Sequence, residues 1–329
     1  MDYLIDIVLM GLLLTTALAM VALRDLFAII MLFSVYSLLS ASFFFNLDAV
    51  DVALTEAAVG AGVWTILMMG TLSMTRRYEQ RRPRRAPLLP LVIVVVTGAA
   101  LIYGTLDMPY FADPAAPIHQ HVAPRYIEQS GAEIGIPNIV ASILASYRGY
   151  DTLGETAVIF TAGLGVLTLL GRFDRRQELA DNRSMYHDMI LRVVGKGLVP
   201  LILLFALYIQ FHGELGPGGG FQAGVIAAAA FILYSIIFGW DRAQKIISPR
   251  VLNIMMASGV LIYGTVGVFG MLLGAEYLNY NVLGSYPEGG QHLGISLVEI
   301  GVGITVSAVM LSIYFDFAAR LAVRKWEGQ

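Results

Sequence analysis

Long apolar runs separated by short polar segments fill the whole chain. Each run holds about 20 residues, the number that an α-helix rising about 1.5 Å per residue needs to cross a hydrocarbon core of roughly 30 Å. We therefore predict an all-α, polytopic membrane protein with about nine transmembrane helices. The predicted spans are 3–22, 26–46, 52–74, 87–106, 151–171, 189–211, 220–240, 251–273 and 295–317.

The composition supports this prediction. Of 329 residues, 57% are hydrophobic and 14% are charged, whereas soluble proteins average about 45–50% and about 25%. The chain has no cysteine, which excludes disulfides, thiolate metal sites and iron–sulfur ligation by its own residues. Met1-Asp2-Tyr3 leads directly into apolar sequence, so we do not expect a cleaved signal peptide.

Arginine and lysine set the expected orientation. Nearly all of them follow the odd-numbered spans, and the opposite side keeps only Arg125 and Arg148. Because cytoplasmic loops carry the excess of these residues, we predict a multi-pass protein of the cytoplasmic (inner) membrane, with the N-terminus outside and the C-terminus in the cytoplasm. The basic residues used are Arg24, Arg76, Arg77, Arg81, Arg82, Arg84, Arg85, Arg172, Arg175, Arg176, Arg183, Arg242, Lys245, Arg250, Arg320, Arg324 and Lys325.

One apolar stretch is too long for a single span. Residues 138–170 would form a straight helix of about 50 Å, and Arg148-Gly149 interrupts it. We interpret 138–147 as a lateral or re-entrant helix at the outer face, with Ile139, Ile143, Leu144 and Tyr147 forming one apolar face.

The basic loops also suggest three modules. Residues 1–78 form a three-helix module. Residues 79–171 hold one span, an outer loop, the lateral helix and a second span, and residues 172–329 form a four-helix module.

Ionisable side chains inside spans are costly, which makes them candidate functional residues. Glu56 lies in the third span among small residues, which let a neighbouring helix pack closely. Because burial disfavours the charged form of a carboxylate, such a group can carry protons. The alternative is a hydrated carboxylate near the outer interface.

Arg148, Asp151 and Glu155 form a second candidate group. Offsets of three and four residues place all three on one face of a helix. Arg148 and Asp151 can then pair and leave Glu155 free to titrate. Alternatively, the pair is an interfacial salt bridge that fixes the corner between the lateral helix and the span.

The second half of the chain offers further polar candidates. Lys196 lies between two glycines in the sixth span, although it and Arg192 are long enough to snorkel to the interface, which is the favoured alternative. The glycine-rich segment from His212 to Gln222 either lines a polar path with irregular backbone or forms a tight turn with close helix packing.

Glu299 completes the candidates, about one turn into the ninth span. Like Asp316 at the inner end of that span, it is expected near an interface. The loop histidines His119, His121 and His292 lack a paired ligand pattern, so no metal site is assigned. No nucleophile–base or nucleotide-binding motif occurs, and we expect neither enzymatic activity nor a cofactor.

Two strings carry a family resemblance. Residues 192–240, with Gly216-Pro-Gly-Gly-Gly-Phe-Gln222, resemble the B subunit of Mrp-type multisubunit cation/proton antiporters. Tyr147-Arg-Gly-Tyr-Asp-Thr-Leu-Gly-Glu155 resembles the carboxyl-terminal tail of their large A subunit, and residues 25–74 resemble the adjoining part of that tail. The tail pieces are also similar to membrane subunits of membrane-bound hydrogenases.

The resemblance implies an accessory, ion-pathway subunit that exchanges cytoplasmic Na⁺ (or K⁺) for external H⁺ together with large proton-channel subunits and small membrane subunits. Glu56 would carry the proton or cation. Asp151 and Glu155 would lie at the outer mouth with Arg148 as their electrostatic partner.

Other functions stay open at this point. One is the membrane arm of a hydrogenase-type or other redox-driven respiratory complex, and another is a purely structural scaffold. A self-sufficient transporter is disfavoured because no inverted repeat pairs two broken helices.

Overall fold

The computed structural model of the chain describes residues 2–80, 88–110, 113–170 and 189–327. Within these ranges every named element is a helix, and nine of the helical segments are long and apolar enough to cross a membrane. The predicted all-α, multi-span class is confirmed. The helices are α1 (Asp2–Ala22), α2 (Leu26–Asn46), α3 (Val50–Glu56), α4 (Thr65–Met74), α5 (Leu88–Thr105), α6 (Pro117–Gln120), α7 (Ala123–Glu133), α8 (Ile139–Ala141), α9 (Gly149–Leu170), α10 (Met189–His212), α11 (Gly220–Phe238), α12 (Trp240–Ile246), α13 (Pro249–Leu272) and α14 (Pro287–Glu327).

Three segments depart from α-helical geometry, and one of them is the short 3-10 helix η4 (Tyr280–Val282). The third span is one helix in three parts, because a π-helical segment, η1 (Ala57–Trp64), joins α3 to α4. A second π-helical segment, η2 (Ser142–Tyr147), continues α8. Such segments are rare and often occur at functional sites. The hydrophobic pattern does not reveal them, because one extra residue per turn leaves a uniformly apolar run unchanged.

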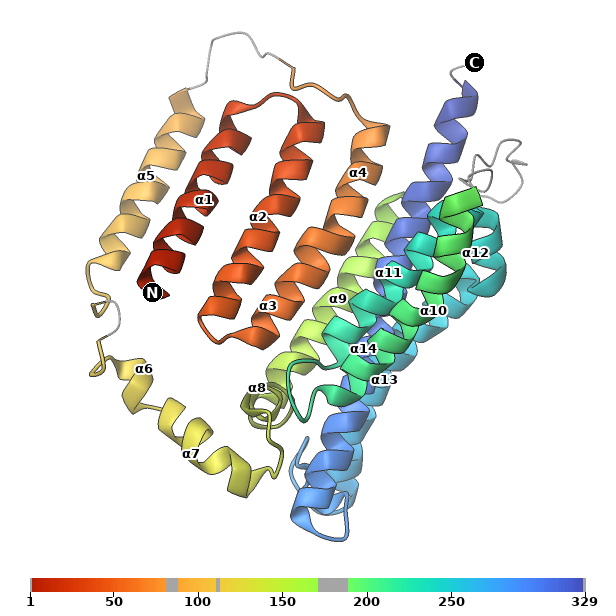
Figure 1. Cartoon of the computed structure of the whole chain (residues 1–329). Coiled ribbons are helices and arrows are strands. Elements are labelled where there is room, and N and C mark those ends of the chain that lie inside the picture. The colour runs from red at the N-terminus through yellow and green to blue at the C-terminus, as the bar shows by residue number, and fades with distance from the viewer. Residues whose placement is uncertain (1, 81–87, 111–112, 171–188, 328–329) are drawn as a thin grey trace.

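The helices stand side by side in a curved row (Figure 1). Helices α1 to α4 form one part of the row, α9 follows, and α10 to α14 form a bundle in which α14 contacts α10, α11 and α13. Helices α6 and α7 run along one end. Helix α5 lies beside α1 in the figure and buries none of its residues.

Polar contacts set the start of this row. Asn46 Nδ2 on α2 donates a hydrogen bond of 2.6 Å to Asp6 Oδ1 on α1. Asp25 caps the N-terminus of α2 through the backbone N–H of Phe27 and forms an ion pair of 2.7 Å with Arg77, beyond α4. These contacts fix how α1, α2 and α4 are aligned along their axes. The apolar surfaces of the helices alone do not specify that alignment.

The core of the molecule surrounds α14, which packs against α4, α9, α11 and α13. Fully buried side chains at this core include Val225 and Ile232 of α11 and Val306 and Leu311 of α14. Small residues allow the closest helix crossings. A side chain at Gly259 of α13 would overlap Thr305 and the carbonyl of Gly301 on α14. Small residues at helix interfaces are typical of membrane proteins.

The ninth span begins earlier than the sequence pattern predicted. Helix α14 starts at Pro287 instead of residue 295, since proline is favoured in the first helical turn. Glu299 therefore lies about three turns inside the helix instead of one.

The segment before α9 forms the predicted short helix, and its small residues, not its large apolar ones, face the rest of the molecule. Residues 139–147 are helical, and α9 begins directly after Arg148. The buried side chains are the small ones, Ala141, Ser142 and Ala145, whereas Ile139 and Leu144 are exposed. Small residues face inward because α14 and the hydroxyl of Tyr280, which donates to the carbonyl of Ala145, approach closely.

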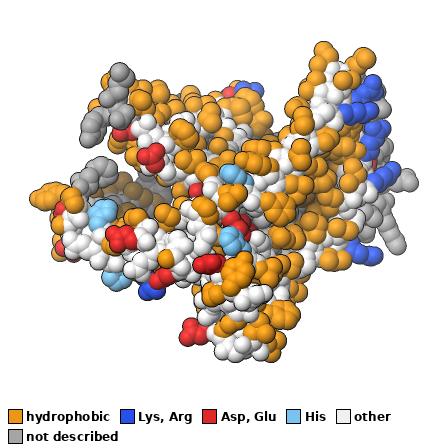
Figure 2. All heavy atoms as spheres, turned by 60° about the horizontal axis from the view of Figure 1, so that its bottom comes forward, with side chains coloured by type: hydrophobic (Ala, Val, Ile, Leu, Met, Phe, Trp, Pro, Cys, Tyr) orange, Lys and Arg blue, Asp and Glu red, His pale blue; other side chains and the backbone are white. Residues whose placement is uncertain are grey.

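Charge is unevenly distributed between the two ends of the molecule. The chain termini lie at opposite ends (Figure 1). Acidic side chains and histidines gather on the face that Figure 2 turns toward the viewer, and most of the visible Lys and Arg lie along the right-hand edge of that view. The basic clusters at 81–85 and 172–183 fall outside the described residues. The orientation across the membrane therefore stays a prediction.

The α13–α14 crossing gives a direct test of the packing. Gly259→Val should lower the free energy of unfolding by about 1–3 kcal/mol, because the added methyl groups overlap α14. Gly264→Val is the matched control on the same helix, since an atom added there first meets the Tyr277 hydroxyl at 3.8 Å. The measurement is thermal unfolding of the purified protein in detergent. Equal effects of the two variants would contradict the proposed crossing.

Candidate functional site

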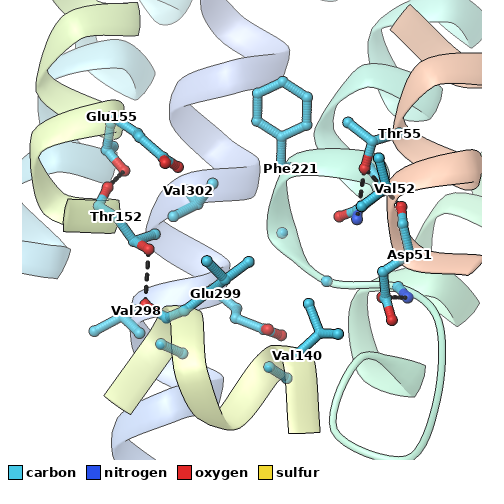
Figure 3. Close-up of a pocket in the computed structure, with 18 of the residues that line it drawn as sticks. Asp51, Val52, Thr55, Val140, Thr152, Glu155, Phe221, Val298, Glu299 and Val302 are labelled. Carbon is cyan, nitrogen blue, oxygen red and sulfur yellow. Dashed lines mark hydrogen bonds between the residues drawn. The ribbon is translucent and has the colours of Figure 1, made fainter. Parts of the chain in front are cut away.

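A cavity of about 330 Å³ lies where three parts of the chain meet. Its walls come from α3, from α8, η2 and α9, and from the second half of the chain, namely the segment 218–219 with α11 and α14 (Figure 3). The apolar lining includes Val140, Leu144, Ile159, Val298 and Val302. Nothing in the local sequence of any one wall predicts this meeting point.

Three carboxylates line this cavity. Asp51 comes from α3, Glu155 from α9 and Glu299 from α14. None of the described residues that line it is a lysine, arginine or histidine. The cavity is therefore a small, mostly apolar space with acidic groups on three sides, and its electrostatic field favours cations.

Glu299 is the central carboxylate. Its side chain reaches into the cavity from α14 toward the segment that connects α10 to α11 (Figure 3). A Cβ atom added at Gly213 or Gly219 would come within 3.1 Å of a Glu299 carboxylate oxygen. No described residue makes a hydrogen bond or an ion pair with this carboxylate. The carboxylate is therefore free to bind water, a proton or a cation inside the cavity.

The glycines of the connecting segment 213–219 make this arrangement possible. Gly218 and Gly219 have φ values of 158° and 124°, which side-chain-bearing residues rarely adopt. A Cβ atom at Gly220 would overlap the backbone of Glu299. The segment is thus a tight turn with close helix packing, and the same residues also form a wall of the cavity.

Hydrogen bonds from distant residues hold this segment in place. Asn138 Nδ2 donates to the carbonyls of Gly213 and Gly216 at 2.8 and 2.9 Å. The backbone N–H of Gly218 donates to Asp51 Oδ1 at 3.0 Å. Gln222 Nε2 donates to Thr55 Oγ1 at 2.9 Å. Polar groups from all three walls are therefore tied to one another.

The predicted Arg148–Asp151 pair is present at the end of η2. Arg148 Nε donates to Asp151 Oδ2 at 2.6 Å, and both side chains are about half exposed. Exposed ion pairs contribute little stability, about 0–1 kcal/mol. Asp151 does not line the cavity, whereas Glu155, one turn further along α9, does.

A second acidic group anchors the same corner. The Tyr147 hydroxyl and Arg125 both donate to the Glu133 carboxylate. These bonds hold the pKa of Glu133 below its usual range. Burial, and then the contact with Glu133, raises the pKa of Tyr147 to about 12. This corner is a structural clamp between α7 and η2, because both groups are already paired.

The other predicted site residues lie outside the cavity, with one exception. Glu56 is on the side of the third span that faces α2, where its carboxylate lies 2.8 Å from a Cβ position built at Gly60, next to Ser37. Lys196 is exposed on α10. The His212 ring stacks on Tyr208 with ring centres 4.9 Å apart. The exception is Gln222, which lines the cavity.

Asp51 and Thr55 are the cavity residues that sequence reasoning missed. Their signal is weak, because they precede Glu56 near the start of a span, where polar residues are common.

Three family models match successive parts of the chain. Residues 11–77 match MbhD, described as the D subunit of MBH, and residues 83–184 match MbhE, described as the E subunit of MBH. Residues 190–312 match a domain related to the MnhB subunit of Na⁺/H⁺ antiporters.

Two relatives illustrate the sequence similarity. A probable K⁺/H⁺ antiporter A/B subunit of Rhizobium meliloti (strain 1021) is 25% identical over 277 residues, or 73% of this chain and 27% of the relative. A "putative antiporter subunit mnhB2" of Staphylococcus aureus (strain Newman) is 32% identical over 135 residues, or 40% of this chain and 95% of the relative. The chain thus spans about a quarter of the longer relative.

Two solved structures share the fold. A chain of the Mrp complex from Dietzia sp. DQ12-45-1b superposes with a TM-score of 0.74 at 25% identity, covering 94% of this chain and 34% of that one. A chain of the membrane-bound sulfane sulfur reductase, an archaeal respiratory membrane complex, gives a TM-score of 0.53 at 28% identity, covering 70% of this chain and 97% of that one.

The hydrogen bonds of Asn138 give a test of the site. Asn138→Ala should lower the free energy of unfolding by about 2 kcal/mol, because it removes a helix cap and leaves one buried and one partly buried carbonyl without their hydrogen-bond donor. Asn253→Ala is the matched control, since no hydrogen bond of the Asn253 side chain is found within the described residues. The midpoint of thermal unfolding measures the difference. Equal midpoints would show that Asn138 does not hold the segment.

Proposed function

Because the chain belongs to the family of MnhB-related antiporter subunits, we propose that it is a membrane subunit of a multisubunit cation/proton antiporter. In this proposal it lies in the cell membrane with companion subunits and contributes the cavity between its three walls to the ion path. The exchange runs cytoplasmic Na⁺ or K⁺ against external H⁺ and is driven by the proton motive force.

The observation that carries the proposal is the set of three carboxylates around one cavity without a basic residue in its described lining. Charged groups inside a membrane protein are costly and persist where they face a partner or a water-filled space. A cation entering this cavity lowers the electrostatic cost of three negative charges. The same carboxylates can instead hold protons, which removes the attraction for the cation.

This competition is the physical basis of exchange. A carboxylate that holds a proton is neutral, and one that attracts a cation is ionised, so occupancy by one disfavours the other. Among the described residues, no three His, Asp or Glu side chains are close enough to hold a metal ion together. The proposed cation therefore keeps part of its hydration shell and passes through, instead of binding tightly.

The remaining predicted residues have different roles in this proposal, according to where they lie relative to the cavity. Glu155 and Glu299 face the ion, and Gln222 orders the wall through its bond to Thr55. Arg148 and Asp151 lie at the outer mouth as an electrostatic pair. Glu56 is a second carrier on the opposite side of the third span. Lys196 and His212 belong to the B-like half, which we propose packs against companion subunits.

A redox-driven respiratory complex is the second candidate function. The matches to MBH subunits and the fold shared with the sulfane sulfur reductase complex favour it. The two candidates differ in their companions, since a redox-driven complex co-purifies with iron–sulfur proteins. They also differ in the driving force, because an antiporter exchanges ions in vesicles under an imposed pH gradient without any electron donor.

Neutralising the central carboxylate tests the proposed path. Glu299→Gln should slow exchange at least about tenfold, since it removes the group that alternates between proton and cation. The assay is cation-induced collapse of a pH gradient in everted vesicles that contain the whole complex. Glu128→Gln is the matched control, because this glutamate is exposed at the same end of the molecule and lies outside the cavity. Wild-type exchange by fully assembled Glu299→Gln complex would refute the path.

Glu56 is tested separately. Glu56→Gln should abolish exchange while leaving the amount of assembled complex unchanged, because glutamine has the size of glutamate and still forms hydrogen bonds but cannot carry a proton. Assembly is followed by co-purification of the companion subunits. Retained exchange would remove Glu56 from the pathway and leave the cavity carboxylates as the only carriers proposed in this chain.

A further inference from the structure

A second, smaller cavity lies beside the first and shares Glu299 with it. Its volume is about 60 Å³, and it is lined by Gln210, Phe211, Glu214, Ser296, Glu299 and Ile300. A space for one water needs about 10–15 Å³ and a few polar partners. The small cavity meets both conditions, because two carboxylates, an amide and a hydroxyl line it.

Glu214 connects this cavity to an exposed histidine. Glu214 Oε1 accepts a hydrogen bond of 2.7 Å from Ser296 Oγ, and Glu214 Oε2 lies 2.7 Å from His292 Nδ1. The Glu214 side chain is 18% exposed and that of His292 is 44% exposed. A continuous series of polar groups therefore runs from the acidic end of the molecule, through His292 and Glu214, to the small cavity and Glu299.

The helical repeat of α14 explains this alignment. His292, Ser296 and Glu299 are separated by four and three residues, so they lie along one face of the helix. Glu214 reaches this face from the turn after α10, where the Asn138 backbone N–H donates to the Glu214 carbonyl at 3.1 Å. The turn that forms a wall of the large cavity thus also fixes Glu214.

We propose that His292 and Glu214 form a proton-access branch that supplies Glu299 from the outer end of the molecule, separately from the route of the cation. This inference rests on the proposed antiport function and names a regulated entry to the same site. It assigns roles to two residues that the sequence left as an unremarkable loop histidine and a turn glutamate.

Each step of the branch moves one proton and nothing else. External water protonates His292 at Nε2, and the Nδ1 proton passes to Glu214 Oε2, which leaves a neutral imidazole. Glu214 then transfers the proton through water in the small cavity to Glu299. Glu299, now neutral, no longer attracts the cation in the large cavity. Release of the proton toward the large cavity restores the Glu299 carboxylate.

The charged surroundings favour this route. The titratable groups around Glu214 are His292 and Glu299 of α14, His212 at the end of α10 and Asp51 of α3. No lysine or arginine is among the described residues that line either cavity. A proton shared between Glu214 and Glu299 is therefore not displaced by a fixed positive charge. Imidazole suits the entry position because one ring nitrogen can accept a proton while the other gives one up.

The test compares pH dependence with cation affinity in the whole complex in everted vesicles. Glu214→Gln keeps hydrogen-bonding partners for Ser296 and His292 but cannot carry a proton. We expect it to slow exchange about tenfold at the alkaline end of the range, to move the pH profile toward lower pH, and to leave the cation concentration for half-maximal exchange within about twofold.

His292→Gln should move the pH profile in the same direction. Glu128→Gln should match the wild type.

Two further variants separate the possible outcomes. Ser296→Ala removes one hydrogen bond to Glu214 but keeps both titratable groups, so it should move the pH profile much less than Glu214→Gln does. If Ser296→Ala reproduces Glu214→Gln, local geometry explains the effect and the branch is overturned. It is also overturned if Glu214→Gln and His292→Gln match Glu128→Gln at every pH, or if they change only cation affinity. If Glu214→Gln reduces the amount of assembled complex, His292→Gln is used for the test instead, because His292 is half exposed.

The same assay distinguishes the branch from the proposed function. If Glu299→Gln slows exchange but Glu214→Gln and His292→Gln exchange like the wild type, the proposed ion path stands and the proton-access branch is rejected. Fully active Glu299→Gln complex rejects the ion path itself, whatever the Glu214 variants do.

Discussion

The close approach of the 213–219 segment to α14 is the contact on which the rest of the site depends. Inside a membrane protein, irregular backbone is tolerated only where its polar groups find partners or line a cavity. Asn138 and Asp51 provide those partners from two other parts of the chain. The glycines remove the side chains that would otherwise separate this backbone from Glu299. Without both features, the Glu299 carboxylate would be covered by side chains, and the two cavities beside it would not form.

The meeting of three segments also gives the family matches a structural meaning. The parts that match three separate family models supply one wall each: α3 lies in the first match, η2 and α9 in the second, and α11 and α14 in the third. The cavity is therefore a property of their combination. Fusion into one chain keeps the walls together at a fixed ratio. Covalent linkage raises the effective concentration of each wall near the next. Walls that are joined by only a few hydrogen bonds can therefore stay assembled.

Much of the fold could be predicted from the sequence, because hydropathy alone locates nine spans and because i, i+3 spacing predicts the Arg148–Asp151 pair. The site could be predicted only in part. Glu155 and Glu299 were selected as ionisable residues of spans and Gln222 as the end of a glycine-rich segment. The contacts that bring the walls together, however, join residues 75 to 167 positions apart. Local patterns carry no information about such pairings. The early start of α14 at Pro287 also escaped the apolar pattern, since its first turns are polar.

The two carboxylates of the third span show what separates a cavity wall from a helix interface. Asp51 and Glu56 are five residues apart, and an α-helix turns about 100° per residue, so they point about 140° away from each other. Asp51 reaches the cavity and the N–H of Gly218, whereas Glu56 faces α2 at the start of η1. One helix thus presents acidic groups to two different environments. A proton or cation that visits both must pass around the helix or depend on a change in its winding, and the π-helical segment directly after Glu56 is the part of the span where regular α-helical hydrogen bonding is already interrupted.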